Sequence, residues 1–240
     1  VYRAGQGGLF DVLRHPDFNE NKQVYLSYAS GNEEANATTV ARATWNQTGL
    51  TNLEVIFEAA PSKYAALHYG GRLAWLPDNT LLLTTGDGFD FREQAQRLDN
   101  HFGKIVRINT DGSVPEDNPF VDIENALPEI YSYGHRNIQG LLHDAETGMI
   151  WQHEHGPRGG DEINLIRAGE NYGWPEVTRG RDYATNLPLG VDSAPGMRDP
   201  VHVFEGRFAP SGLAVVSGED DHRLVVEVWY ELCLQLFLCL

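Results

Sequence analysis

Short apolar or alternating segments recur through the first half of the chain, bounded by glycine, asparagine, aspartate or proline. They are rich in β-branched and aromatic residues, as is typical of β-strands. The expected strands cover 24–28, 38–45, 53–59, 72–76, 80–86 and 103–109. Hairpin-type turns are expected at Pro77-Asp78-Asn79, Asp111-Gly112 and Thr147-Gly148. No amphipathic pattern of twelve residues stands out, so the best helical candidate is a short connection within residues 92–103.

One outline returns four times along the chain. A small or glycine-rich opening, an apolar strand and a turn begin near Gly8, Gly71, Gly140 and Gly212, at spacings of 63, 69 and 72 residues. This period accommodates a four-stranded sheet with long loops, and radial stacking of such sheets gives a β-propeller. A β-sandwich would contain similar strands without the recurrence. The sequence therefore predicts an all-β fold, with about four propeller blades in this chain.

The composition and net charge of the chain limit the classes of partner that it is expected to bind. The 240 residues are 41% hydrophobic and carry a formal net charge of −16, with 34 acidic and 18 basic residues. This balance argues against nucleic acid or an anionic membrane as a partner, because both favour a basic face. It suits a protein that holds divalent cations, although solubility alone explains the charge equally well. No run of eighteen apolar residues predicts a membrane span.

The two ends of the chain differ from its body. We expect residues 1–216 to form the partial propeller and residues 217–240 to be a divergent tail of doubtful origin. The tail is apolar, poor in turns, and contains both cysteines, Cys233 and Cys239. Unpaired, its apolar residues would form an exposed, sticky strand. No signal peptide precedes the first strand, and the chain opens at Val1 as if truncated or processed.

Polar residues crowd into the glycine-rich stretch 129–175, which contains GHRNIQG at 134–140 and EHGPRGGDEINLIRAGENYGWP at 154–175. Polar groups concentrated in loops usually serve a site, because burying them in a core is costly. Alone, Arg136 suits either a carboxylate or carbonyl ligand or an ion pair with Asp144. Asp161 and Glu162 fit a solvated acidic turn equally well. Asp87 and Asp90, in GDGFD, lack EF-hand spacing and are interpreted as a turn.

These strings, with LHYGGR at 67–72 and GGRLAWLPDNTLLLTTGDG at 70–88, resemble the glucose/sorbosone dehydrogenase family, especially its PQQ-dependent aldose sugar dehydrogenases. The likeness runs from about Gly5 to Leu213. It implies a six-bladed propeller, incomplete in this chain. It also implies that the C1 hydroxyl of an aldose is oxidised to a lactone with the cofactors PQQ and Ca²⁺.

The resemblance also implies roles for individual residues. His68 would be the base and Arg136 would polarise the quinone carbonyl that receives hydride. The remaining implied residues are the cofactor contacts Gln6, Asn137 and Gln139, the carbonyls of Gly156 and Pro157 for the calcium at the quinone, Glu162 and the Tyr172 carbonyl for a second calcium, and His155 and Arg158 at the sugar entrance. Leu67 stands where relatives usually carry Asn or Asp, so the residue that would orient the base at that position is missing.

The same resemblance implies an aldose substrate, an external electron acceptor, a periplasmic or secreted location and possibly a homodimer. Two other functions stay open at this point. One is a non-catalytic propeller that binds a ligand or a partner protein, and the other is a calcium-dependent lactonase-type hydrolase. No Walker A, HExxH, CxxC or G-x-S-x-G motif supports other chemistry.

Overall fold

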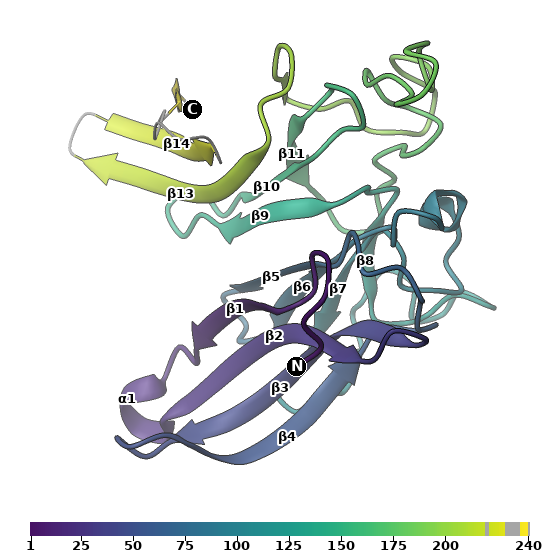
Figure 1. Cartoon of the computed structure of the whole chain (residues 1–240). Helices are drawn as coiled ribbons and strands as arrows, with labels where there is room; N and C mark the ends of the chain where they lie inside the picture. Colours follow the sequence, from purple (N-terminus) through teal and green to yellow (C-terminus); the bar gives the residue numbers. More distant parts are fainter. Residues whose placement is uncertain (219–220, 229–235, 240) are drawn as a thin grey trace.

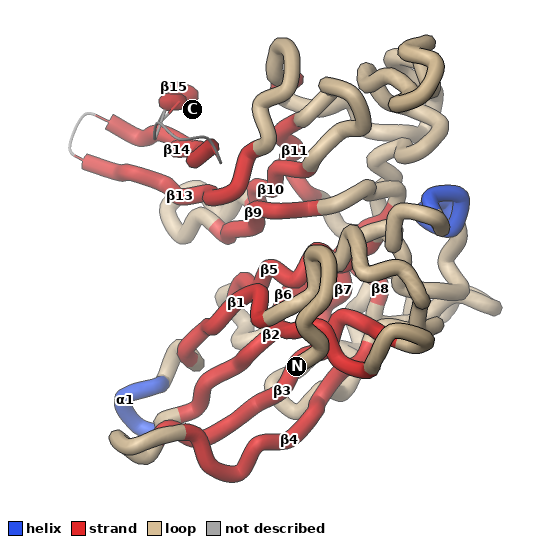
Figure 2. The backbone as a smooth tube through the Cα atoms, in the orientation of Figure 1, coloured by secondary structure: helices blue, strands red, loops and turns tan. Residues whose placement is uncertain are grey.

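The structure, a computed structural model, describes residues 1–218, 221–228 and 236–239. Strands and loops make up nearly all of it (Figure 2), with helical turns only in α1 (Phe18–Asn21) and a 3-10 helix (Arg92–Gln96) among the described residues. The strands are β1 (Leu9–Arg14), β2 (Gln23–Gly31), β3 (Asn36–Trp45), β4 (Leu50–Glu58), β5 (Gly70–Trp75), β6 (Leu81–Thr85), β7 (Lys104–Ile108), β8 (Ile130–Tyr133), β9 (Ile138–His143), β10 (Ile150–Glu154), β11 (Glu162–Ile166), β12 (His202–Val203), β13 (Pro210–Gly218), β14 (Asp221–Val228) and β15 (Leu236–Cys239).

Consecutive strands form four antiparallel sheets, β1–β4, β5–β8, β9–β12 and β13–β15. The first strands of successive sheets lie side by side, since β1 contacts β5, β5 contacts β9 and β9 contacts β13 (Figure 1). Sheets that meet through their first strands around a common axis are the blades of a propeller. The all-β fold and the four blades are therefore confirmed, and each recurring glycine lies in or just before the first strand of its blade.

All six expected strands are present, shifted by one to three residues at their ends. Pro77-Asp78-Asn79 and Thr147-Gly148 connect β5 to β6 and β9 to β10, as expected for hairpin turns. The prediction for Asp111-Gly112 was wrong, because this turn opens the long connection from β7 to β8. Arg107 holds that connection against the sheet, with its guanidinium 2.6 Å from Asp78 Oδ2 and 2.9 Å from Asp117 Oδ1.

Three apolar clusters lie between neighbouring blades. The cluster between the first and second blades includes Tyr25, Val40 and Leu81, and the cluster between the second and third includes Ile105 and Ile138. A third cluster, around Trp151, Ile163 and Leu224, joins the third and fourth blades. Complete burial of an aliphatic side chain of this size contributes about 1.5–3 kcal/mol. Blade-to-blade packing therefore holds the loops at the blade ends in register.

The division of the chain into a partial propeller (residues 1–216) and a tail (residues 217–240) stays a prediction. Within the expected tail, β14 pairs with β13 and with β15, so the described tail residues extend the fourth sheet. Trp229, Leu232, Cys233 and Leu234 lie outside the described residues. In the described part of the chain, no helix has the length and apolar character needed to cross a membrane.

Candidate active site

Two hollows adjoin where loops of the second and third blades meet. One, of about 460 Å³, has His68, Arg136 and Pro157 among its lining residues. The other, of about 470 Å³, has Gln6, Asn137, Gln139 and His155 among its lining residues. The two meet where Gln6 Oε1 accepts a hydrogen bond from the backbone N–H of His68, at 2.8 Å. The structure thus brings together most of the residues that the sequence assigned to chemistry.

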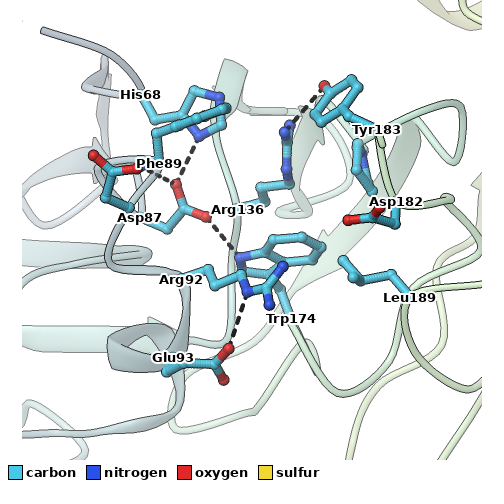
Figure 3. A pocket seen from close by; sticks show the side chains of 12 residues that line it. His68, Asp87, Phe89, Arg92, Glu93, Arg136, Trp174, Asp182, Tyr183 and Leu189 are labelled. Carbon is cyan, nitrogen blue, oxygen red and sulfur yellow. Dashed lines mark hydrogen bonds and ion pairs between the residues drawn. The ribbon is translucent and has the colours of Figure 1, made fainter. Parts of the chain in front are cut away.

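His68 lies at the entrance to β5, in a left-handed backbone conformation with φ 47°. Its imidazole is 6% exposed, and its Nδ1 lies 2.7 Å from Asp87 Oδ1 (Figure 3). A carboxylate at this distance accepts the Nδ1 proton, which leaves Nε2 with its lone pair. Burial lowers the pKa of His68 although Asp87 opposes that shift, while Arg136 and His155 add to it. The imidazole is therefore neutral and able to accept a proton at neutral pH.

Asp87 is a candidate functional residue that the sequence interpretation missed. It is 1% exposed, and its carboxylate accepts from His68 Nδ1, from Phe89 N at 2.9 Å and from Trp174 Nε1 at 2.8 Å. Leu67 leaves no orienting side chain at position 67, but His68 is oriented all the same, because Asp87, in the loop after β6, lies against its Nδ1. The available signal was the position of Asp87 directly after a buried strand.

Arg136 is nearly buried and its guanidinium is directed inward. Nη1 donates to the carbonyls of His155 and Gly156, both at 2.8 Å, and Nη2 lies 3.3 Å from Tyr183 Oη. The Trp174 ring lies under the guanidinium at 5.3 Å. The alternative that Arg136 pairs with Asp144 is wrong, because Asp144 instead accepts from His222 at 2.7 Å.

Amide side chains gather in the second hollow. Asn137 Oδ1 accepts from Gln139 Nε2 at 3.1 Å and from the N–H of Gly70 at 3.3 Å. Arg72, in the same hollow, donates from Nε to the Gln139 carbonyl at 2.7 Å. Gln6 is exposed, and its carbonyl is already held by His68 N. The hollow therefore offers amide groups and one cation to an anionic, planar ligand.

The loop that contains Gly156 and Pro157 is fixed by Asp161. This carboxylate accepts from Gly156 N at 2.8 Å and from the N–H groups of Phe208 and Ala209, each at 2.9 Å. A Cβ at Gly156 would lie 2.2 Å from the Gly159 carbonyl, so the tight turn requires glycine. Asp161 is thus part of the scaffold, and the interpretation of it as a solvated turn residue is wrong.

Glu162 lies outside both hollows, between the second and third blades. It lies directly opposite Glu154 on the neighbouring strand β10. Burial raises the pKa of Glu154 to about 8, and burial together with the charge of Glu154 raises the pKa of Glu162 well above its usual range. Two carboxyls this close and short of water cannot both ionise without a cation.

Tyr172 approaches the same carboxyl pair indirectly. Its ring stacks on His135 with centroids 4.7 Å apart, and His135 Nδ1 lies 3.6 Å from Glu154 Oε2. Burial lowers the pKa of His135 to about 3, so this imidazole supplies no positive charge at neutral pH. Of the two members of the expected second calcium site, Glu162 is thus the cross-strand partner of Glu154, and Tyr172 is linked to Glu154 only through His135.

Several buried polar atoms around the carboxyl pair lack hydrogen-bond partners within the described residues. They are both amide atoms of Gln152, Oδ1 of Asn164 and Nδ1 of His135. Gln152 lies opposite Asn164 and two residues from Glu154, on the same face of the sheet. No group of three or more His, Cys, Asp and Glu in the described ranges is arranged to hold a metal. A cation here would therefore rely on carbonyl and amide oxygens beside the carboxyls, as Ca²⁺ does.

Comparison with known proteins decides the family. The family described as Glucose / Sorbosone dehydrogenase matches residues 1–227. The chain belongs to the glucose/sorbosone dehydrogenase family. This confirms the resemblance inferred from the motifs.

Curated relatives are longer than this chain. It is 48% identical over 229 residues to the uncharacterised protein slr1608 of Synechocystis, covering 91% of this chain and 56% of that protein. It is 36% identical over 224 residues to aldose sugar dehydrogenase YliI of Escherichia coli, covering 91% of this chain and 60% of the relative. The chain thus spans less than two thirds of these two family members.

Solved structures share the fold. A crystal structure of a glucose dehydrogenase superposes with a TM-score of 0.88 at 39% identity, over 93% of this chain and 67% of that chain. The PQQ-bound form of an aldose sugar dehydrogenase from Streptomyces coelicolor superposes with a TM-score of 0.74 at 29% identity, over 95% of this chain and 65% of that one. The four blades therefore correspond to about two thirds of each of these structures.

Proposed function

We propose that this family member takes part in PQQ- and Ca²⁺-dependent oxidation of the C1 hydroxyl of aldose sugars to lactones. The observation that carries the proposal is the His68–Asp87 pair, a neutral buried imidazole opposite Arg136 in one hollow. An alcohol oxidation needs a base for the hydroxyl proton and a stabilised acceptor for the hydride. The chain supplies residues suited to both requirements.

In this reaction, His68 carries out the proton transfer. Nε2 accepts the proton of the C1 hydroxyl, while Asp87 stabilises the imidazolium that forms and fixes its tautomer. Burial of the imidazole keeps it unprotonated before the step, which favours its action as a base at neutral pH. The substrate would lie in the hollow that His68, Arg136 and Pro157 line.

The residues of the second hollow fit the cofactor. PQQ is a tricarboxylic ortho-quinone, and Gln6, Asn137 and Gln139 offer amide groups for its oxygens, with Arg136 at the border. When bound, the quinone supplies the hydride-accepting chemistry. Arg136 offers a fixed guanidinium to polarise a carbonyl oxygen, because its Nη1 is already anchored to two backbone carbonyls. The PQQ-bound relative from Streptomyces coelicolor supports this assignment.

Calcium fits the chain at two places. The Gly156 and Pro157 carbonyls lie beside the hollows on a loop braced by Asp161. Glu162 and Glu154 form the second place, where burial raises the pKa of two facing carboxyls, and Tyr172 is joined to it through His135. Ca²⁺ takes carboxylate and backbone oxygens together, and its charge would allow both carboxyls to ionise.

The expectations about the substrate, the electron acceptor, the location and the oligomeric state stay predictions. We propose an aldose substrate, an external electron acceptor and a periplasmic or secreted location, in keeping with the enzyme names that relatives carry. A homodimer and the separate status of residues 217–240 are likewise proposals.

Reconstitution tests the function. The purified chain is incubated with PQQ and Ca²⁺, and dye reduction is followed with glucose and other aldoses. We expect reduction that requires both cofactors and falls by about 10²- to 10⁴-fold in His68→Gln. PQQ binding without dye reduction would instead indicate a binding module. Lactone hydrolysis that is indifferent to PQQ would indicate the hydrolase.

A further inference from the structure

Trp174 contacts both halves of the proposed catalytic apparatus, although it lies 87 residues from Asp87 in the sequence. Its indole Nε1 donates to Asp87 Oδ2 at 2.8 Å, and its ring lies 5.3 Å from the Arg136 guanidinium carbon (Figure 3). The side chain is 5% exposed.

The backbone around Trp174 is held from two sides. Its N–H donates to the Gly134 carbonyl at 2.9 Å, and its own carbonyl accepts from Gln96 Nε2 at 2.7 Å. These contacts tie the segment to the second blade and to the loop that precedes Arg136. The position of the indole is therefore set independently of its bond to Asp87.

We propose that Trp174 is a positioning residue for the base: its indole N–H orients the Asp87 carboxylate toward His68 Nδ1, and its ring supports Arg136. Without the indole, Oδ2 of Asp87 would lose the hydrogen bond from Nε1, and the carboxylate could rotate away from His68. The Asp87 carboxylate raises the pKa of His68 against the effect of burial, so a carboxylate that turns away lowers that pKa. Trp174 therefore governs both the orientation and the basicity of His68. This inference rests on the proposed function only in treating His68 as the base.

A second buried tryptophan offers a matched control. Trp151 is also 5% exposed and packs between the third and fourth blades, but its indole Nε1 has no hydrogen-bond partner within the described part of the chain. Tryptophan-to-phenylalanine changes at the two positions remove the same atoms from similarly buried sites. Only the change at 174 removes a contact to Asp87.

The charged and titratable groups that face His68 come from several segments. They are Asp87 from the loop after β6, Arg136 from the loop before β9, His155 directly after β10, and Asp90, Arg92, Glu93, Asp182 and Tyr183 around the same hollow. All of them remain in Trp174→Phe. A change in His68 titration in that variant therefore reports the loss of the indole rather than the loss of a charge.

The test is a pH titration of ¹⁵N-labelled histidine side chains by NMR, in the purified chain without cofactor. His68 is assigned from its absence in His68→Gln. We expect Trp174→Phe to lower the pKa of His68 by at least about half a unit and to weaken the preference for the Nδ1–H tautomer. We expect Trp151→Phe to leave the titration of His68 unchanged. An unchanged His68 titration and tautomer in a folded Trp174→Phe variant would overturn the proposal.

An isosteric replacement covers the case in which Trp174→Phe does not fold. β-(3-benzothienyl)alanine has the shape of tryptophan without the N–H, and its incorporation at 174 should likewise lower the pKa of His68. If the titration with this residue is the same as in the wild type, the hydrogen bond has no positioning role.

The activity measurement separates this inference from the proposed function. With cofactors bound, Trp174→Phe should move the acid limb of the kcat/KM profile to lower pH and lower kcat more than it raises KM. If the NMR titration shifts but no sugar is oxidised by the wild type, Trp174 positions the imidazole and the dehydrogenase proposal fails. If the wild type oxidises sugar and the acid limb is identical in the variant, the positioning role fails.

Discussion

Arg136 contacts two buried pairs of side chains, His68–Asp87 and Glu154–Glu162. The two pairs differ in how fully their polar atoms are hydrogen-bonded within the protein. The Arg136 carbonyl accepts from Asp87 N at 2.7 Å, and its N–H donates to Glu154 Oε2 at 3.0 Å. In the His68–Asp87 pair, every carboxylate oxygen has a donor within the protein. In the Glu154–Glu162 pair, two acids face each other among unpartnered amide atoms.

This difference separates a proton-transfer site from a cation-dependent one. A carboxylate that accepts three hydrogen bonds is stable when buried and can orient a base. Two buried carboxyls without a cation retain at least one proton, so an added cation must displace it. The first pair should therefore govern activity directly, and the second should govern stability through calcium.

The largest expected loss of activity comes from changing Asp87 in the His68–Asp87 pair. Asp87→Asn preserves the size of the side chain but removes the charge that stabilises the imidazolium, and it allows the wrong tautomer. We expect kcat with PQQ and Ca²⁺ to fall by about 10²- to 10⁴-fold. Steady-state dye reduction measures this loss. Asp122→Asn, at an exposed position far along the β7–β8 connection, is the control. Retention of full activity in Asp87→Asn would contradict the assignment of the base.

The second-largest effect is on stability, and it comes from replacing Glu162 in the Glu154–Glu162 pair. Calcium at 100 times its Kd should stabilise the wild type by about 2.7 kcal/mol. In Glu162→Gln this gain should largely disappear, while the calcium-free variant should be more stable than the calcium-free wild type. Denaturant unfolding with calcium and with chelator measures both. Glu116→Gln, an exposed isosteric change, should behave as the wild type does. Equal stabilisation by calcium in both variants would show that the calcium site does not include the Glu154–Glu162 pair.

Third, the two pairs should respond to pH in opposite directions. Burial raises the pKa of Glu154 to about 8, so its contribution to stability is present below the unfolded pKa near 4.5 and is lost as pH rises toward 8. The lowered pKa of His68 acts the other way, because its contribution is lost as pH falls below about 6.5.

In chelator, we therefore expect the unfolding free energy to decline between pH 5 and pH 8, because the raised pKa values of the two glutamates outweigh the opposite contribution of His68. The decline should be smaller in Glu154→Gln. Unfolding curves at a series of pH values provide the measurement. A wild-type stability that is flat or rising across this range would show that the glutamates are already ionised without calcium.

The smallest effect is expected at the rim of the hollow. Tyr183 is 48% exposed and its hydroxyl lies 3.3 Å from Arg136 Nη2, a long contact for a hydrogen bond. Tyr183→Phe should change kcat/KM by less than about threefold, because two carbonyls still hold Nη1. A loss comparable to that of Asp87→Asn would mean that Tyr183, rather than the two carbonyls, holds the guanidinium.

Much of the fold was accessible from local patterns. The strands were visible because alternation and β-branched residues depend only on neighbours in the sequence. The four blades were visible because the repeat places a glycine at the start of each first strand. The turn at Asp111-Gly112 was assigned to the wrong connection, because a turn signal does not specify whether the next strand pairs with the previous one.

The candidate site was only partly accessible. The motifs identified His68, Arg136 and the amides because these residues lie close together within two or three strings. Asp87 was interpreted as a turn residue, although it follows a buried strand. Glu154 was not singled out at all, because its significance comes from Glu162 on the neighbouring strand.

By itself, the sequence determined the blades, the family and the identity of most residues around the hollows, since each depends on spacing along the chain. Only the tertiary structure decided which groups pair. Asp87 meets His68 and Trp174, and Glu154 meets Glu162, because blade packing brings separate loops to one end of the propeller and excludes water there. Those two consequences, proximity and desolvation, set the charge of each group, and neither is encoded in the spacing of any one motif.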